Sequence, residues 1–370
     1  MYHPRPPHPY AGAPFPDRPD VQANATPANP PVRSLPALRI GYACAAVAEV
    51  LREEDVLAVF EFGARGATPA DPRHVHVALE TIGPAQLEVW RGSQAVTCGH
   101  EGMLRWSTDD HYLFFAIEVD EAPFGGPEQA AEHAYREIGR LLDGFRFERG
   151  GPAHVLRFWN YLDAINEGDG DDERYRHFCS GRARGIDSAS RNGFPAATAI
   201  GRHDGRRVLQ VYGLGARLAG TAIENPRQVS AWRYPREYGP TPPTFARATR
   251  TGAGQLFVSG TAAVIGHASQ HAGDTAAQIE ETLNNVDVLL ATADESDVGA
   301  AGAGLVLKAY VRDPVDAATV DSRIRSRHPA LAGLLVLVGD ICRRELRVEI
   351  DGVHAPARVQ ATDIQDHSVV

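Results

Sequence analysis

The chain has 370 residues, of which 43% are hydrophobic and 23% charged, and its formal net charge is −10. This composition is typical of a folded globular protein with room for two domains. The acidic balance argues against the broad basic face that nucleic-acid binding needs, although a buried pocket with its own arginines could still hold an anionic substrate.

Four cysteines are scattered along the chain and form no CxxC pair, so they indicate neither a disulfide framework nor a zinc site. Reduced thiols in a cytoplasmic protein are the expectation. No apolar run approaches the ~20 residues that span a bilayer, so no membrane association is expected. Residues 1–36 are rich in proline, lack the apolar core of a secretory signal and are predicted to form a disordered tail.

Strand-like runs dominate the first part of the chain. They begin near Leu38 and continue at 56–63, 74–82, 85–92 and 112–120. A helix is then predicted from Pro127 to residue 145, because proline suits a first helical turn and apolar residues from Ala131 to Leu141 recur at helical spacing.

The same order of elements recurs in the second half. A strand at 255–266 leads to a helix at 275–293, whose first residues, T-x-x-Q, predict a capping box. In each half a strand, a helix-like segment and a pair of strands follow, at 154–226 and 305–352. We therefore predict a divergent internal duplication of fold class α+β, with α/β-type layers in which helices pack on one face of mixed sheets. The expected domains are 37–235 and 236–370.

A segment rich in proline, arginine and tyrosine joins the two halves at 224–249. Long irregular segments inside compact proteins are usually functional or act as linkers. The side chains of this segment, among them Tyr234, Arg236 and Tyr238, favour the wall of a pocket over a spacer.

Successive blocks of the second half resemble the YjgF/RidA family: YGPTPPTFARAT, LFVSGTAAVIGH, GDTAAQIEETLNNVDVLLATA, LKAYVRDP and LRVEIDG. The resemblance covers residues 238–354. It implies a chorismate-mutase-like α+β unit, commonly trimeric, with ligand sites between sheets. RidA enzymes hydrolyse imines and keep an arginine in the strand before the acidic one. That stretch reads ALAGLLVLVGD here and has no arginine, so imine deamination is not expected.

Three further blocks look like chorismatases, in particular the hydroxybenzoate-forming type of xanthomonadin pigment synthesis: ERYRHFCSGRARGI, AGTAIENPRQVSAWRYPREYGP and GDICRRELRVEIDG. This likeness covers most of the chain beyond the tail. It implies conversion of chorismate to 3-hydroxybenzoate and pyruvate, with 4-hydroxybenzoate as a candidate second product. No cofactor and no metal are expected, because the chain has no Walker motif, nucleotide-binding glycine loop or convincing metal set.

Glu349 is the candidate acid for removal of the enolpyruvyl group. In LRVEID, Leu346, Val348 and Ile350 share one strand face, so Glu349 lies on the other. Spacing alone favours an exposed strand acid, whereas the resemblance implies the catalytic glutamate, with Glu345 as the fallback. A carboxyl group in a dry pocket, with a raised pKa, could donate the proton.

Cys342 lies seven residues before Glu349. A lone cysteine is most often a small buried hydrophobe. Chorismatases that form aromatic products resemble this sequence in having a cysteine here, which implies that the thiol acts on the ring intermediate.

Chorismate carries two carboxylates, so its site should supply arginines and tyrosines. Tyr175 and Arg182 would share a face if their segment is helical, because they are two turns apart; the rival interpretation is a solvated charged helix. The other predicted binding residues are Tyr212, Tyr234, Arg236, Arg247 and Arg312.

Two alternative functions remain open at this point. One is hydrolysis of chorismate to the dihydroxycyclohexadiene acid without aromatisation, and the other is a YjgF-like protein that binds a small metabolite without turnover. The expected assembly is a homotrimer, as in YjgF relatives, or a pseudo-symmetric monomer in which the duplication replaces part of the trimer.

Overall fold

The computed structural model describes residues 35–64, 70–84, 87–293 and 304–355. The described residues belong to one compact unit, so the domain boundary expected between residues 235 and 236 stays a prediction. The Pro-rich tail lies outside the described residues, apart from its last two positions. Leu35, the first of these two, is buried against the core.

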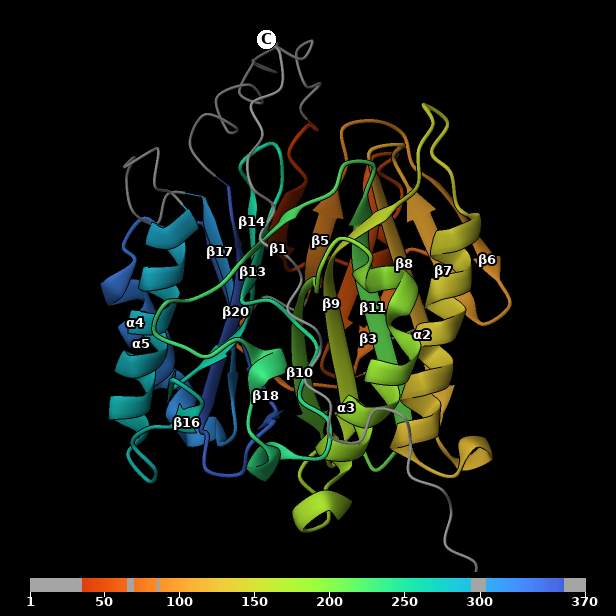
Figure 1. Ribbon diagram of the computed structural model, residues 1–370. Coiled ribbons are helices and arrows are strands. Elements are labelled where there is room, and N and C mark those ends of the chain that lie inside the picture. Colours follow the sequence, from red (N-terminus) through yellow and green to blue (C-terminus); the bar gives the residue numbers. More distant parts are fainter. Residues whose placement is uncertain (1–34, 65–69, 85–86, 294–303, 356–370) are drawn as a thin grey trace, which may run out of the picture. The chain divides into compact units, whose positions relative to one another are not determined.

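Residues 97–216 build most of a seven-stranded sheet (Figure 1). Its strands lie in the spatial order β19-β10-β9-β11-β8-β7-β6. In chain order the elements are β6 (Thr97–Glu101), β7 (Leu104–Thr108), β8 (Tyr112–Asp120), α2 (Pro127–Gly144), β9 (His154–Asp163), α3 (Arg174–Gly185), β10 (Ala196–Arg202) and β11 (Val208–Ala216). Strands β9 and β10 run parallel, and the other pairs are antiparallel.

The second half of the chain builds another seven-stranded sheet, in the order β12-β13-β14-β20-β17-β18-β4. Its elements are β12 (Thr221–Ile223), β13 (Ala248–Arg250), β14 (Leu256–Ala262), α4 (Thr275–Ala293), β17 (Leu305–Val311), α5 (Ala317–Arg327), β18 (Gly333–Val338) and β20 (Val348–His354). A hairpin of β15 (Val264–Ile265) and β16 (Ala268–Ser269) precedes α4, and β19 (Asp340–Ile341) precedes β20.

The strand order confirms the predicted duplication. The series β10-β9-β11-β8-β7 in one sheet matches β18-β17-β20-β14-β13 in the other, and the parallel pair occupies the same place in both. The helices α2 and α3 follow the same strands as α4 and α5. Figure 1 shows α4 and α5 together beside one sheet and α2 and α3 together beside the other.

A third and reduced copy was not predicted from the sequence. Residues 39–91 form a four-stranded sheet with the order β1-β5-β2-β3, in which β2 and β3 are parallel. Its elements are β1 (Arg39–Ala43), α1 (Val47–Val50), β2 (Val56–Phe62), β3 (His74–Val77) and β5 (Leu87–Arg91). This order repeats β8-β11-β9-β10, although α1 has only four residues and the described residues between β2 and β3 include no helix.

Short segments tie each sheet to the next at three seams. At seam 1, β4 (Thr81–Ile82) follows β3 in the chain but pairs with β18. At seam 2, β19 follows β18 but pairs with β10. At seam 3, the end of β10 and the start of β11 meet β3, where Gln210 Nε2 donates a hydrogen bond to His76 O (2.9 Å).

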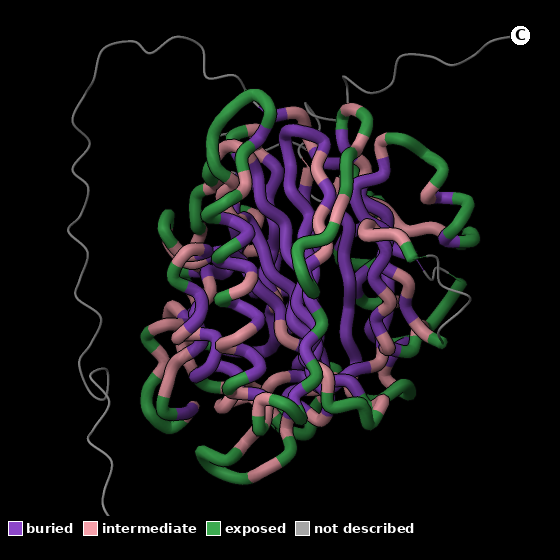
Figure 2. The backbone as a smooth tube through the Cα atoms, turned by 90° about the vertical axis from the view of Figure 1, so that its right-hand side faces the viewer, coloured by how far each residue is buried: buried purple, intermediate pink, exposed green. Residues whose placement is uncertain are grey.

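The inner faces of the three sheets share one core. Aromatic side chains from every sheet meet there, including Trp90, Trp159, Tyr212 and Tyr310. In Figure 2 the strands are buried over most of their length and the turns at their ends are exposed. Residues that alternate to the outer faces of the large sheets pack against the helices, so each helix pair covers the side away from the shared core.

Both long helices are present as expected, but the predicted capping box at α4 is wrong. The side chain of Asp274 accepts a hydrogen bond from Ala277 N (3.0 Å), so the helix is capped one residue earlier. Gln278, the glutamine of the motif, binds the backbone of a loop instead of the start of the helix. Gln278 Nε2 donates to Glu345 O (2.9 Å) and its Oε1 accepts from Arg347 N (2.8 Å), which anchors the loop before β20.

Candidate active site

A cavity of about 340 Å³ opens at seam 2. Its walls come from the start of α3, the irregular segment 228–247, strand β14, and the loop and strand that follow β19. Five of the nine predicted catalytic and binding residues line it: Glu349, Cys342, Tyr175, Tyr234 and Arg247. The fallback acid Glu345 and Tyr238 of the irregular segment line it too. The seam therefore brings together residues from both halves of the chain.

Glu349 projects from β20 into this cavity, because its neighbours Val348 and Ile350 face the helix layer. Its side chain is 4% exposed, and no described residue donates a hydrogen bond to it. Burial, followed by the negative charge of Asp351, raises the pKa of Glu349 to about 8, while nearby arginines act in the opposite direction. The carboxyl group is therefore largely protonated at neutral pH.

Gly260 in β14 makes room for this carboxyl group. A Cβ atom at position 260 would lie 1.9 Å from Oε1 of Glu349 and 3.3 Å from Oγ1 of Thr198. The first distance is far inside van der Waals contact, so any side chain here must displace the glutamate. The glycine of the VSGTA block thus serves close packing at the site.

Asp351 lies two residues along β20 on the same face as Glu349 and is completely buried. Its Oδ2 accepts hydrogen bonds from Tyr310 OH (2.9 Å), Thr198 Oγ1 (3.0 Å) and Trp159 Nε1 (3.1 Å). Arg157 Nη2 also lies 3.1 Å from this oxygen. These donors fix the carboxylate in one position beside the glutamate.

Cys342 and Tyr175 both line the cavity and pack against the core beneath the first large sheet. Burial, followed by the nearby Glu349, raises the pKa of the Cys342 thiol well above its usual range. Burial also raises the pKa of the Tyr175 phenol. Both groups remain protonated at neutral pH and can donate a proton or a hydrogen bond, so Cys342 is not poised as a thiolate nucleophile.

Four arginines line the cavity, and two of them, Arg247 and Arg343, have no carboxylate partner among the described residues. Arg247 Nη2 donates to Val229 O and to Tyr234 OH (2.7 Å each), while its buried Nε has no hydrogen-bond partner among the described residues. Arg343 lies over the ring of Tyr238, with 3.9 Å between its Cζ atom and the ring centroid. Both guanidinium groups are thus held in place with donors left for an anionic ligand.

Arg312 lies outside the cavity lining, and its guanidinium group is fully engaged. Its Nε donates to Leu346 O (2.9 Å), and its Nη2 donates to Ile341 O and Arg343 O (3.0 Å each). Nη1 bonds two further side chains. The residue holds the loop 341–346 in place, and it leaves no donor for a substrate.

Three more predicted residues lie outside the lining. Tyr212 is fully buried in the shared core. Arg236 is exposed and pairs with Asp171. Arg182 is buried on α3, with its Cζ atom 5.2 Å from the ring centroid of Tyr135, and its Nε and Nη2 atoms have no hydrogen-bond partner in the described part of the chain. Among these three residues, Arg182 alone is buried with unused donors.

Other residues of the lining were missed by sequence reasoning. Arg343 and Arg344 line the cavity, and two adjacent cations in the loop before the acidic strand were a signal for an anionic ligand. Arg176, one residue after Tyr175, also lines the cavity. The proximity of Gly260 to the carboxyl group left no sequence signal, because it depends on the bulge in the pairing of β14 with β20.

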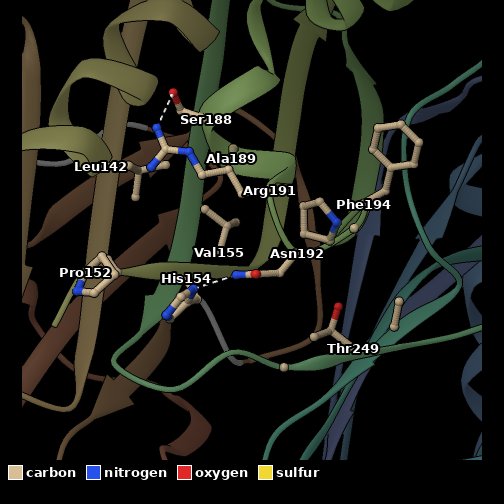
Figure 3. A pocket seen from close by; sticks show the side chains of 15 residues that line it. Leu142, Pro152, His154, Val155, Ser188, Ala189, Arg191, Asn192, Phe194 and Thr249 are labelled. Carbon is tan, nitrogen blue, oxygen red and sulfur yellow. Dashed lines mark hydrogen bonds between the residues drawn. The ribbon is translucent and has the colours of Figure 1, made fainter. Parts of the chain in front are cut away.

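A smaller cavity, of about 90 Å³, lies between the end of α2 and residues 188–195 (Figure 3). Its polar groups engage one another: Asn192 Nδ2 contacts His154 Nδ1 (2.6 Å), and Arg191 Nη2 donates to Ser188 Oγ (3.3 Å). The described residues that line it include no carboxyl group. It therefore lacks an acid for the expected chemistry, and the cavity at seam 2 is the candidate active site.

Within the described ranges, no group of three or more His, Cys, Asp or Glu side chains is placed to hold a metal ion. None of the helices found there combines the length and the apolar character needed to cross a bilayer. All four cysteines are free thiols, of which Cys44 and Cys98 are exposed.

Comparisons with known proteins identify the family of this chain. Residues 88–215 match the family model "Chorismatase FkbO/Hyg5-like, N-terminal". A 3-hydroxybenzoate synthase of Streptomyces hygroscopicus is 36% identical over 282 residues, which cover 72% of this chain and 80% of that protein. A chorismatase of Streptomyces rapamycinicus is 39% identical over 286 residues, covering 72% and 82%. A crystal structure of a chorismatase superposes with a TM-score of 0.73 at 32% identity, covering 87% of this chain and 99% of that one. The chain therefore belongs to the chorismatase family of enzymes.

Proposed function

We propose that the protein converts chorismate to 3-hydroxybenzoate and pyruvate, with Glu349 as the proton donor. The observation that carries the proposal is a buried carboxyl group with a pKa of about 8 that faces an arginine-lined cavity. A general acid works best when its pKa lies near the working pH. The aromatic product is favoured by the likeness to the relative named 3-hydroxybenzoate synthase.

The arginines account for substrate binding. We assign the two carboxylates of chorismate to Arg247 and Arg343, whose guanidinium groups are held at the cavity. Arg182 is the third candidate, because a buried cation with unpaired nitrogens is costly and a carboxylate would relieve that cost. The phenols of Tyr175 and Tyr234 are the donors for the ring oxygens.

The chemistry begins when Glu349 gives its proton to the methylene carbon of the enol ether. Water then adds to the resulting oxocarbenium carbon, and the hemiketal collapses to pyruvate and a ring hydroxyl. Loss of one water molecule from the dihydroxycyclohexadiene acid gives the aromatic product. The water added in the first stage balances the water lost in the second, so chorismate yields 3-hydroxybenzoate and pyruvate with no net consumption of water.

We assign the second stage to Cys342, which lies at the cavity wall as a neutral thiol. The thiol can give its proton to the hydroxyl group as it leaves, and the strongly basic thiolate that remains can take the ring proton whose loss aromatises the ring. Water is then lost, the thiol is restored, and the position of the thiol directs which hydroxyl leaves. Without it, the reaction would end at the diene-diol, which is the nearest alternative product.

The decisive experiment is incubation of the purified protein with chorismate and no added metal, with pyruvate measured enzymatically and the ring product identified by chromatography. We expect pyruvate and 3-hydroxybenzoate in equal amounts from the wild type, and pyruvate with diene-diol from Cys342→Ala. Wild-type diene-diol would remove the role of the thiol. Pyruvate release no faster than the spontaneous reaction would contradict the proposal and favour a metabolite-binding protein.

We also propose a cytoplasmic location, since the exposed thiols of Cys44 and Cys98 are free. A membrane-impermeant thiol reagent should label both residues in cell lysates and neither in intact cells. Labelling in intact cells would contradict this location.

A further inference from the structure

A cavity of about 300 Å³ lies at seam 3, where the pseudo-symmetry places the counterpart of the active site. Its lining repeats the components of the active site: the end of β10 and the turn that follows it, the start of β11, and the facing positions of β8. Gln210 occupies the position of Glu349, because Gln210 pairs with Tyr161 as Glu349 pairs with Tyr310. The cavity at the active site, about 340 Å³, is of similar size.

Two buried side chains that line this cavity have unused hydrogen-bonding capacity. Arg202 is 3% exposed, and its Nε has no hydrogen-bond partner among the described residues. Gln210 is 2% exposed, and its Oε1 is likewise without a partner there, although its Nε2 donates to Glu118 Oε1 (3.2 Å). A buried donor and a buried acceptor left open are costly, and a ligand that pairs with both would relieve the cost.

The charges around the cavity favour an anion. Its two carboxylates are already paired, Asp71 with Arg73 (2.8 Å) and Glu118 with Arg105 (2.8 Å). Arg202 Nη1 lies 3.3 Å from Asp204. Positive charge remains at the rim of the cavity, where a second arginine is exposed at position 206 and has no ion pair within the described residues. A carboxylate is therefore the group that this surplus can hold.

We propose that the cavity at seam 3 is a second ligand site, which binds a hydroxy-substituted cyclic carboxylate without transforming it. Arg202 Nε and Arg206 hold the carboxylate, and Gln210 Oε1 accepts a hydrogen bond from the ring hydroxyl. An amide cannot supply the proton that Glu349 supplies at seam 2, so binding here is not followed by cleavage. The identification of this ligand with the product 3-hydroxybenzoate rests on the proposed function.

Calorimetry of the full chain with 3-hydroxybenzoate tests the proposal. We expect two molecules per chain in the wild type. In Gln210→Glu and in Arg206→Ala we expect the second site to weaken by about tenfold or more, which corresponds to about 1.4 kcal/mol. Arg136→Ala, which removes an exposed arginine from α2, is the matched control and should keep both sites. Since Arg206 is on the surface, its variant remains informative if the buried Gln210 variant fails to fold.

Pyruvate and inorganic phosphate serve as probes that lack the ring hydroxyl, and each should bind seam 3 at least about tenfold more weakly. Equal affinity for phosphate would overturn the assignment of the hydroxyl to Gln210. One molecule per chain, in a preparation that releases pyruvate from chorismate, would overturn the second site alone. Two bound molecules without turnover would instead sustain the second site and contradict the proposed function.

Discussion

Glu349 is held neutral by its surroundings, and this state has a measurable pH signature. Because its pKa is about 8, the acid form dominates below that pH and declines above it. We expect kcat/KM for chorismate to be flat between about pH 6 and 7 and to fall by about tenfold per unit above pH 8. An alkaline limb that survives in Glu349→Asp, displaced but present, would support the assignment. A profile that rises through pH 8 would contradict it.

Removal of the same carboxyl group tests its role directly. Glu349→Gln keeps the size of the side chain but provides no acid, so we expect kcat to fall by about 10²–10⁴-fold while binding of 3-hydroxybenzoate persists. The matched variant is Glu345→Gln, whose carboxylate is exposed and bonded to Ser269 Oγ (2.6 Å). A larger loss from Glu345→Gln than from Glu349→Gln would transfer the catalytic role to the loop.

The close packing of Gly260 against Glu349 predicts that a side chain at position 260 impairs catalysis. In Gly260→Ala the new Cβ would meet Oε1 of Glu349 at 1.9 Å, so the carboxyl group must move away from its present position. We expect kcat to fall more than KM rises, with a loss of stability of about 1–3 kcal/mol from overpacking. The control Gly252→Ala has open space around its Cβ position. Unchanged kinetics in Gly260→Ala would show that the position of the carboxyl group is not critical.

The loop between β19 and β20 is the element on which the site depends most. Arg312 binds three of its backbone carbonyls and thereby sets the positions of Cys342 and Arg343. A lysine has a single ammonium group and cannot reach all three, so Arg312→Lys should lose about 2–3 kcal/mol of stability. We expect a fall in kcat and faster hydrogen exchange in residues 341–346.

Arg327→Lys on α5 is the control for this change, because its guanidinium group is exposed and bonds only side chains of α4. If hydrogen exchange of the loop were the same in Arg312→Lys and in the wild type, the anchoring role of the arginine would be refuted.

Elements with a strong local pattern were predictable from the sequence. The helices α2 and α4 show apolar residues at helical spacing, and the strands around them alternate, so the duplication of the large sheets could be recognised. The third copy could not, because α1 has four residues and gives no helical period. The pairing of the two short strands β4 and β19 could not be predicted either, since each pairs with a sheet other than the one formed by the preceding strand in the chain.

The candidate site was likewise predictable only where a local pattern marked it. Alternation in β20 predicted that Glu349 lies on the face opposite to Leu346, Val348 and Ile350, and the resemblance to chorismatases implied its role. Alternation could not tell whether the opposite side of a strand faces a cavity or another sheet. Tyr212 shows the limit: it lies on the inner face of β11, but a neighbouring sheet seals that face and makes it part of the core.

The buried acid makes the stability of the entire protein depend on pH. The pKa of Glu349 is raised from 4.5 to about 8, so its contribution to stability is fully present below pH 4.5 and is lost as pH rises towards 8. We expect Glu349→Gln to be more stable than the wild type at pH 9, by at most about 5 kcal/mol, and close to it at pH 4. Denaturant titrations at the two pH values measure the difference. A stabilisation at pH 4 that equals the one at pH 9 would exclude ionisation as its cause.

The three sheets also determine the assembly that we expect. A protein with one such sheet per chain needs the sheets of two further copies to cover its inner face, so it is expected to form a trimer. Here all three sheets belong to one chain. Their seams are closed by β4 on β18, by β19 on β10, and by hydrogen bonds such as that from Gln210 to the carbonyl of His76.

The inner faces are therefore already buried within the chain, and further copies would add no apolar surface to this core. We propose that the enzyme is a monomer and expect light scattering to give a mass near the 39.9 kDa of one chain at micromolar concentration. Activity per chain should then not change on dilution. A mass three times larger would show that a trimer forms through outer surfaces, and a loss of activity on dilution would show that the site needs a second copy.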